Sequence, residues 1–470
     1  MFTSVRNRWG TEGGYRDFLA LAFPLILSTA SWSVQHFVDR VFLAWHSTQS
    51  MAAALPAGLS NFVFVSFFLG LAGYVNTFVA QYVGARRPER VGASIWQGSY
   101  LSWGAGLAAL GLLPFAGPLF DLIGHEPAIR SEEVAYFRIL CFGTGPFVLA
   151  TVLSCFYSGR GKTWIVLIVN ASATCVNIGL DYVLIFGYWG FPVMGIRGAA
   201  WATNIAAAFS ALLFGVLILR RRNREEFGTL SQWKFDWDLF RRLLRFGIPS
   251  GVNFMLDIMA FSFFILIVGR LGTLELAATN LAFNVSSLAF MPLLGCGIAV
   301  STLVGQRLGE NYPDKAEYCT WSGMHLALGY MGTMAVLYVC VPQWFLVPYG
   351  LRAQGEDFAA AQNLAEGLLR IVAVYCVFDG MYIVFTSALK GAGDTRYVML
   401  VSIGLSWLVM LIPAFVGIAF FDIGIWTLWV FLCAYIVAAG IVFYFRFRSS
   451  TWKTMRVIEE THQVAGVDAG

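Results

Sequence analysis

The sequence contains little charge. Only 12% of its 470 residues are Asp, Glu, Lys or Arg, and 58% are hydrophobic, whereas soluble domains average about 25% charged and about 45–50% apolar residues. Long polar linkers are also missing, because the longest polar stretch runs only from Arg220 to about Arg245. Most of the remaining sequence consists of apolar runs long enough to cross a hydrocarbon core as helices of about 20 residues. The composition therefore excludes an ordinary soluble protein and predicts an all-α polytopic membrane protein.

Patterns of metal ligands, disulfides and catalytic groups are absent as well. No two of the eight cysteines have CxxC spacing, and all lie in or beside apolar runs, so we expect them to be buried packing residues. The five histidines form no HExxH pattern or similar zinc motif, and no DDxxD cluster indicates a prenyl transferase. The net charge of +4 is small and is dispersed among short loops, which argues against a nucleic-acid partner. We therefore expect neither an enzyme nor a resident cofactor or metal.

Twelve apolar spans follow one another along the chain. An even number of spans places both termini on one side of the membrane. Lys and Arg crowd the loops on that side, above all between Arg220 and Arg245, and this bias is typical of the cytoplasmic side. We therefore expect a multi-pass protein of the cytoplasmic membrane with both termini in the cytoplasm. The expected spans are at about 17–45, 56–83, 93–118, 134–157, 164–188, 198–220, 243–269, 280–308, 317–347, 367–389, 397–420 and 425–446.

The two sets of six spans are related by an internal repeat at an offset of 225 residues. The string VAQYVGARRPER, with Gln81 and Gly84, recurs as VGQRLGENYPDK, with Gln306 and Gly309. Both strings follow the second span of their set and lie on the same side, so the repeats are parallel. The sequence predicts two pseudosymmetric six-helix bundles with a central cleft, an architecture suited to alternating access. The expected boundaries are 1–222 for the amino-terminal lobe, 223–242 for a cytoplasmic linker and 243–470 for the carboxy-terminal lobe with its short cytoplasmic tail.

Four acidic residues lie inside the predicted spans. An ionisable group in hydrocarbon is costly and marks a pathway or a binding site by default. Asp39 lies in the first span, Asp181 in the fifth, Asp257 in the seventh and Asp379 in the tenth, and Asn177 precedes Asp181 by one helical turn. We expect Asp257 and Asp379 to lie close together in a cleft of low polarity, where two carboxylates ionise easily only with a cation beside them.

These motifs together resemble the multidrug and toxin extrusion (MATE) family over nearly the whole chain. They are the early Pro24 and Asp39, VAQYVGARRPER and its repeat, NIGLDYVLIFG, GIRGAAWAT and LKGAGDT. The resemblance implies export of cationic, amphipathic organic compounds in exchange for H⁺ or Na⁺. It also implies an amino-lobe cation-coupling site and a carboxy-lobe site for a cation or substrate, the latter typical of the NorM-type branch. The amino-lobe residues are Asp39, Asn177, Asp181 and Thr203, and the carboxy-lobe residues are Asp257 and Asp379; either group is a possible Na⁺ site.

The chain also departs from the family pattern. Where members commonly read VDxxxVGRLG, this chain reads VDRVFLAWHS, with Arg40 directly after Asp39 and with Trp45 and His46 in place of Gly-Arg. Arg40 points about 100° away from Asp39 on a helix, so we do not expect it to neutralise that acid. One alternative is a lipid-linked sugar flippase of the same superfamily, which needs a basic cavity, whereas the charges here are mostly acidic. The expected partners are cationic or aromatic drugs and membrane lipids, and we expect a monomer.

Overall fold

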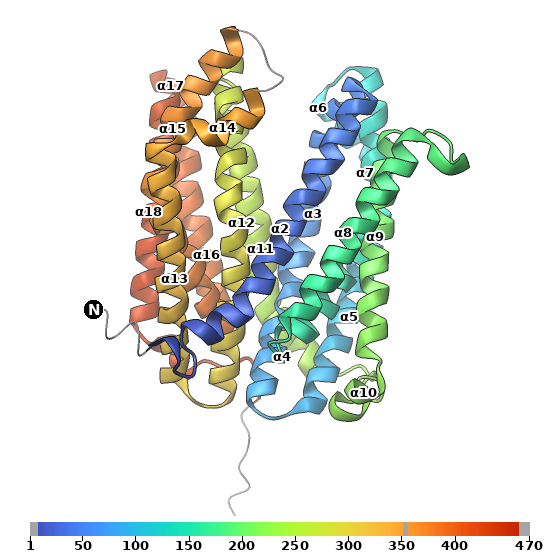
Figure 1. The fold of residues 1–470 in the computed structure, drawn as a ribbon, viewed down its shortest axis with the longest axis vertical. Helices are drawn as coiled ribbons and strands as arrows, with labels where there is room; N and C mark the ends of the chain where they lie inside the picture. Colours follow the sequence, from blue (N-terminus) through green and yellow to red (C-terminus); the bar gives the residue numbers. More distant parts are fainter. Residues whose placement is uncertain (1–7, 351–355, 460–470) are drawn as a thin grey trace, which may run out of the picture.

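The computed structural model describes residues 8–350 and 356–459, which form helices joined by short connections (Figure 1). We use first half for α2 to α9 and second half for α11 to α18. The elements are α2 (Tyr15–His46), α3 (Thr48–Gly73), α4 (Val75–Gly84), α5 (Pro88–Leu110), η1 (Leu113–Phe115), α6 (Ala116–Ile123), α7 (Pro127–Ser158), α8 (Thr163–Phe186), η2 (Tyr188–Gly190), α9 (Ile196–Ile218), α10 (Arg221–Phe227), α11 (Trp237–Val268), α12 (Thr273–Gly309), α13 (Pro313–Cys340), α14 (Pro342–Gly350), α15 (Glu356–Ala392), α16 (Thr395–Leu405), η3 (Ser406–Leu411), α17 (Ile412–Phe421), α18 (Ile425–Arg448) and η4 (Thr451–Thr454).

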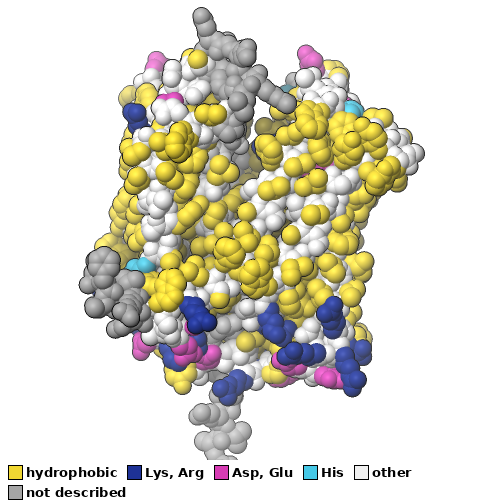
Figure 2. All heavy atoms as spheres, viewed as in Figure 1, with side chains coloured by type: hydrophobic (Ala, Val, Ile, Leu, Met, Phe, Trp, Pro, Cys, Tyr) yellow, Lys and Arg dark blue, Asp and Glu magenta, His cyan; other side chains and the backbone are white. Residues whose placement is uncertain are grey.

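Twelve of the helical segments are long and apolar enough to cross a membrane, which confirms the predicted number of spans. They contain 23 to 37 residues each. Large apolar side chains remain exposed on their outer surfaces; Leu107 on α5 is 71% exposed and Phe420 on α17 is 76% exposed. Hydrophobic side chains cover most of the flank seen in Figure 2. A surface of this kind is stable in contact with lipid chains, whereas in water it promotes aggregation.

Four predicted spans are not continuous α-helices. The expected span at 56–83 is divided by a turn at Tyr74, between α3 and α4. The expected helix over 317–347 ends at Cys340, because Val341 precedes Pro342 and leaves the helical conformation; α14 then begins. The expected span at 93–118 turns into the short helix η1 after α5, where Pro114 lacks a backbone donor. Within 397–420, the six residues of η3 form a π-helix between α16 and α17, a distortion that proteins use mainly at functional sites.

The two halves lie mainly on opposite sides of the molecule in Figure 1, with α2 crossing obliquely between them. α2 packs on both α8 and α12, and α12 also packs on α4, while α11 packs on α3. At the crossing of α4 and α12 a side chain on Gly84 would overlap the carbonyl of Gln306, and one on Gly309 would overlap the carbonyl of Gln81. These two close approaches are related by the 225-residue repeat, so each glycine is required for the same backbone contact.

Beside this crossing lie two hydrogen bonds related by the same repeat, which we call the glutamine clasp; one joins α4 to α15 and the other joins α12 to the residue after α7. Gln81 donates from Nε2 to the carbonyl oxygen of Gly391 at 3.0 Å, and Gln306 donates from Nε2 to that of Gly159 at 2.8 Å. Both bonds join the first half to the second. The clasp lies near the end of α4, at the lower end of the molecule in Figure 1, and the basic side chains seen in Figure 2 gather mainly at that same end.

The cysteines are all free, but not all of them are buried. Cys141, Cys155, Cys319 and Cys376 are buried as expected, whereas Cys175 and Cys340 are exposed. The expectation of eight buried packing residues is therefore wrong for these two. They lie on α8 and α13, where an exposed small apolar side chain is tolerated without a packing role.

Candidate ion and substrate sites

The acidic residues of the first half meet where α2 packs on α8. Asp39 lies two turns before the end of α2, and Asp181 lies between one and two turns before the end of α8. The site is thus nearer to the ends of these helices that lie away from the glutamine clasp. The carboxyl groups of Asp39 and Asp181 are close enough to interact directly. Asp181 and Asn177 are both fully buried, and Asp39 is half-buried.

This first-half cluster lacks hydrogen-bond partners. Within the described residues, no partner is found for Oδ1 of Asp39, for either oxygen of Asp181, or for either amide atom of Asn177. Burying a polar atom without a hydrogen bond costs about 1–3 kcal/mol, and buried polar groups in folded proteins nearly always have a partner. A shared proton or a small cation between the carboxyl groups would supply what these atoms lack, and Asn177 offers a neutral oxygen as a further ligand.

Three neighbours shape the electrostatics of the first-half cluster. Tyr136 on α7 interacts electrostatically with both Asp39 and Asp181, and His36 and Arg40 interact with Asp39. Arg40 is exposed and forms no ion pair among the residues that the structure describes. Sequence reasoning did not single out Tyr136, because it is one of 18 tyrosines and carries no motif of its own.

No hydrogen bond joins Thr203 to the other three predicted members of this cluster within the described residues. It lies on α9, which packs on α8, and its hydroxyl donates to the carbonyl of Ala199 in its own helix at 3.0 Å. Its hydroxyl is therefore already used by the backbone, a common arrangement for threonine in a helix.

The second-half cluster centres on Asp257 of α11 and is well supplied with partners. Asn253 donates to Oδ2 of Asp257 at 3.1 Å, and the hydroxyl of Tyr382 on α15 donates to the same oxygen at 3.3 Å. Lys390, also on α15, donates from Nζ to Oδ1 of Asn253 at 2.7 Å. The Tyr382 hydroxyl lies 3.5 Å from that of Ser402 on α16. Asp257 therefore accepts hydrogen bonds, whereas Asp181 has no donor within the part of the chain that the structure describes.

Asp379 lies near this cluster without joining it. Its carboxyl group forms no hydrogen bond or ion pair within the described part of the chain. Asp379 and Asp257 are both electrostatic neighbours of Tyr382 and Tyr435, but no direct interaction between the two carboxyl groups is found among the described residues. Both acids thus lie around the same two tyrosines, and the close approach of Asp257 and Asp379 to each other stays a prediction.

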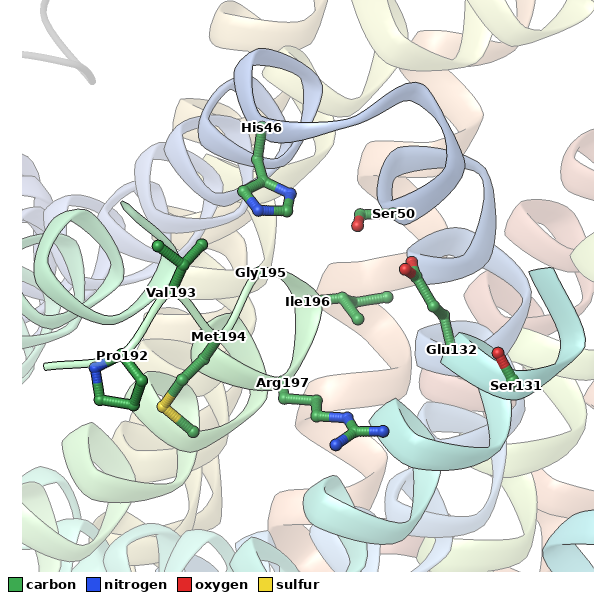
Figure 3. A pocket seen from close by; sticks show the side chains of 10 residues that line it. All are labelled: His46, Ser50, Ser131, Glu132, Pro192, Val193, Met194, Gly195, Ile196 and Arg197. Carbon is green, nitrogen blue, oxygen red and sulfur yellow. The ribbon is translucent and has the colours of Figure 1, made fainter. Parts of the chain in front are cut away.

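A cavity of about 460 Å³ opens at the end of the bundle away from the glutamine clasp (Figure 3). It contains none of the predicted site residues, although His46 is only two turns beyond Asp39 on α2. The hydroxyl of Ser50 is fully buried and, like Oε2 of Glu132, has no partner among the described residues. The lining consists of His46, Ser50, Ser131, Glu132, the loop residues Pro192 to Gly195, Ile196 and Arg197.

Comparison with known proteins identifies the family to which this fold belongs. The MatE family matches residues 24–183 and 249–416, one segment in each half. A probable multidrug resistance protein NorM of Brucella suis is 29% identical over 452 residues, covering 95% of this chain and 94% of that protein. A protein of the same description from Burkholderia pseudomallei is 31% identical over 388 residues, covering 82% of each.

A solved structure shows the same fold. It is described as the outward-facing conformation of a multidrug resistance MATE family transporter of the MOP superfamily. It superimposes with a TM-score of 0.84 at 20% identity and covers 94% of this chain and 97% of that chain. Because the family match includes Asp39, Asp181, Asp257 and Asp379 and spans more than half of the sequence, the resemblance read from the motifs is confirmed: the chain belongs to the MATE family in its NorM-type branch, and it is a multidrug efflux transporter rather than an enzyme.

Proposed function

We propose that this transporter exports cationic, amphipathic organic compounds in exchange for H⁺ or Na⁺ by alternating access. The observation that carries the proposal is the first-half cluster of Asp39, Asn177 and Asp181. All of its polar side-chain atoms except Oδ2 of Asp39 are buried inside apolar spans without hydrogen-bond partners among the described residues, and such groups mark ion pathways in membrane proteins. No resident cofactor is needed, because the gradient of the coupling ion supplies the driving force.

The exchange requires that ion and substrate weaken one another's binding. When a proton or Na⁺ neutralises Asp39 and Asp181, a cationic substrate loses the negative charge that holds it and leaves. When the ion departs, the ionised cluster attracts the next substrate. Asn177 supplies an oxygen ligand in the Na⁺ case, with Thr203 as a further ligand after rotation of its hydroxyl. Asp257 and Asp379 bind substrate or a second cation in the other half.

The glutamine clasp supports the alternating-access part of this proposal. Its two hydrogen bonds hold the halves together at one end of the molecule. Breaking these bonds is the step that lets the halves separate at that end. In the same scheme residues 1–222 and 243–470 rock as two lobes joined by the linker at 223–242. The basic end of the molecule faces the cytoplasm, both termini lie there, and the protein works as a monomer in the cytoplasmic membrane.

Transport of ethidium into inverted membrane vesicles tests the proposal. An imposed gradient of H⁺ or of Na⁺, with the higher ion concentration inside the vesicle, is expected to drive ethidium inward. The ion whose gradient drives this uptake is the coupling ion. Asp39→Asn is expected to abolish this uptake while the protein stays folded and membrane-inserted, because one of the two interacting carboxylates is lost. Asp121→Asn is the matched control, since Asp121 pairs with exposed Arg130 outside both clusters. Normal uptake by Asp39→Asn contradicts the assigned site.

A further inference from the structure

Lys390 is placed to act on Asp257 from a neighbouring helix. α15, which carries Lys390, packs on α12, α13 and α18, whereas α11, which carries Asp257, packs on α16. The Lys390 ammonium nevertheless reaches α11, where it donates to Asn253 at 2.7 Å. Asn253 in turn donates to the carboxylate of Asp257 at 3.1 Å. The side chains thus form a chain in which one amide connects a cation to an anion.

The ammonium and the carboxylate are also electrostatic neighbours. Each stabilises the charge of the other, and no ion pair closer than 4.0 Å joins them among the described residues. In the apolar interior an isolated charge is costly, and a nearby opposite charge offsets much of that cost. Among the described residues, the other polar groups that face this site are the hydroxyls of Tyr382, Tyr435 and Ser402, and none of these carries charge.

The position of Lys390 is fixed from the other half of the molecule as well. The hydroxyl of Tyr74, in the turn between α3 and α4, donates to the backbone carbonyl of Lys390 at 2.9 Å. Gly391, the next residue, accepts the clasp bond from Gln81. The turn of α15 that carries Lys390 is therefore held by two contacts across the boundary between the halves.

We propose that Lys390 is a built-in counter-ion of the second-half site and that it determines which acid there receives a cationic ligand. This inference rests on the proposed function. Through Asn253, the tethered ammonium balances the charge of Asp257, so a monovalent organic cation gains little by approaching that acid. Asp379 has no such partner within the described chain. It is therefore the acid that binds a cationic substrate, and Asp257 becomes available only when Lys390 moves away.

A double-mutant cycle on the purified full-length protein tests this assignment. Binding of tetraphenylphosphonium, a hydrophobic monovalent cation, is measured for the unmodified protein, Lys390→Gln, Asp257→Asn and the double variant. Lys390→Gln exposes the charge of Asp257 and is expected to tighten binding about tenfold, within the range of typical coupling between sites. Asp257→Asn leaves the ammonium unbalanced and weakens binding. The double variant removes both charges and is expected to return to nearly unmodified affinity.

The controls separate this role from a purely structural one. Lys390→Arg keeps the charge and is expected to bind like the unmodified protein, and Lys162→Gln removes an exposed lysine far from Asp257 and leaves binding unchanged.

The inference is overturned if Lys390→Gln tightens binding equally with and without Asp257. It is also overturned if the double variant stays as weak as Asp257→Asn, which would make Asp257 the binding acid. If Lys390→Gln fails to fold, the comparison of Asp257→Asn with the double variant, which lacks both charges, still tests whether Lys390 is the counter-ion of Asp257. Absence of binding by the unmodified protein overturns the proposed function, and the inference with it.

Discussion

At the scale of single residues, the two acidic clusters differ in how well their oxygens are hydrogen-bonded. Oδ2 of Asp257 accepts two hydrogen bonds, whereas both oxygens of Asp181 are buried without a partner among the described residues. A carboxylate that is already satisfied gains less from a bound ion than one that is not. The unsatisfied cluster is therefore the better candidate for ion coupling.

This difference predicts unequal effects of two matched substitutions. Asp181→Asn is expected to change the apparent affinity of transport for its coupling ion by about tenfold, whereas Asp257→Asn changes it much less, since coupling free energies of this kind are about 1–3 kcal/mol. Ethidium uptake measured against lumenal pH and Na⁺ concentration gives both values. Unchanged ion dependence in Asp181→Asn would make that residue a structural acid only.

Much of the candidate site was predictable from the sequence because an acid stands out within an apolar run. The four acids and Asn177 were identified in that way, and Thr203 through a family motif. Lys390 does not stand out in the same way, because it lies at a helix end beside the polar GAGDT string, where charge is expected. Tyr136 and Tyr382 were missed because an aromatic residue within a span is usually a packing residue. Which of these groups meet depends on how helices cross, and no local pattern encodes that.

At the scale of helices, the glutamine clasp ties α4 to α15 and α12 to the end of α7, and the two bonds together hold α4 and α12 at their crossing. Gln81→Leu leaves the carbonyl of Gly391 without its donor, and the loss of such a bond costs about 1–3 kcal/mol. We expect amide hydrogen exchange to rise roughly tenfold not only in α4 but also across the contact in the last turns of α12.

Gln97→Leu is the matched control for this experiment. Gln97 is equally buried, but it donates to the carbonyl of Lys234 in the connection before α11 and does not take part in the α4–α12 crossing. Its replacement is expected to leave exchange in α12 unchanged. If both variants raise amide hydrogen exchange in α12 equally, the clasp does not specifically hold the halves together.

The helices themselves were more predictable than their interruptions. Hydropathy located all twelve spans, because the thickness of the hydrocarbon core requires long apolar runs regardless of packing. The break at Val341 is encoded by the following proline, but the apolar run continues through it and conceals it. The π-helix of η3 has no local signature in its own six residues. It reflects how α16 and α17 pack against α11 and α18.

At the scale of the whole molecule, Glu459 after the last helix binds groups from both halves. Its carboxylate accepts hydrogen bonds from Tyr82 on α4 at 2.7 Å, from Arg90 on α5 at 3.0 Å and from Arg242 on α11. Arg87 pairs with it at 3.5 Å. The carboxy-terminal segment thus crosses the same face as the glutamine clasp and adds a charged contact between the halves.

The ionisation of Glu459 gives this contact a definite pH dependence. Partial burial opposes its charge, but the hydrogen bonds from Tyr82 and Arg242 outweigh burial and lower the pKa of the carboxyl from 4.5 to about 2. Because the pKa in the folded protein is below that of the unfolded chain, the stabilisation is fully present above about pH 4.5 and is lost as the pH falls towards 2. Glu459→Gln removes it at every pH. The side chain is 35% exposed, so we discount the effect to about 1 kcal/mol.

The predicted signature is a difference in melting temperature that depends on pH. At neutral pH the unmodified protein in detergent is expected to melt roughly 1–2 °C above Glu459→Gln, and the gap should close progressively below about pH 4.5. Glu225→Gln, which removes an exposed acid paired only within α10, should show no comparable gap. A gap that persists at acidic pH would mean that Gln disturbs packing rather than charge. No gap at neutral pH would mean that this segment does not hold the halves together.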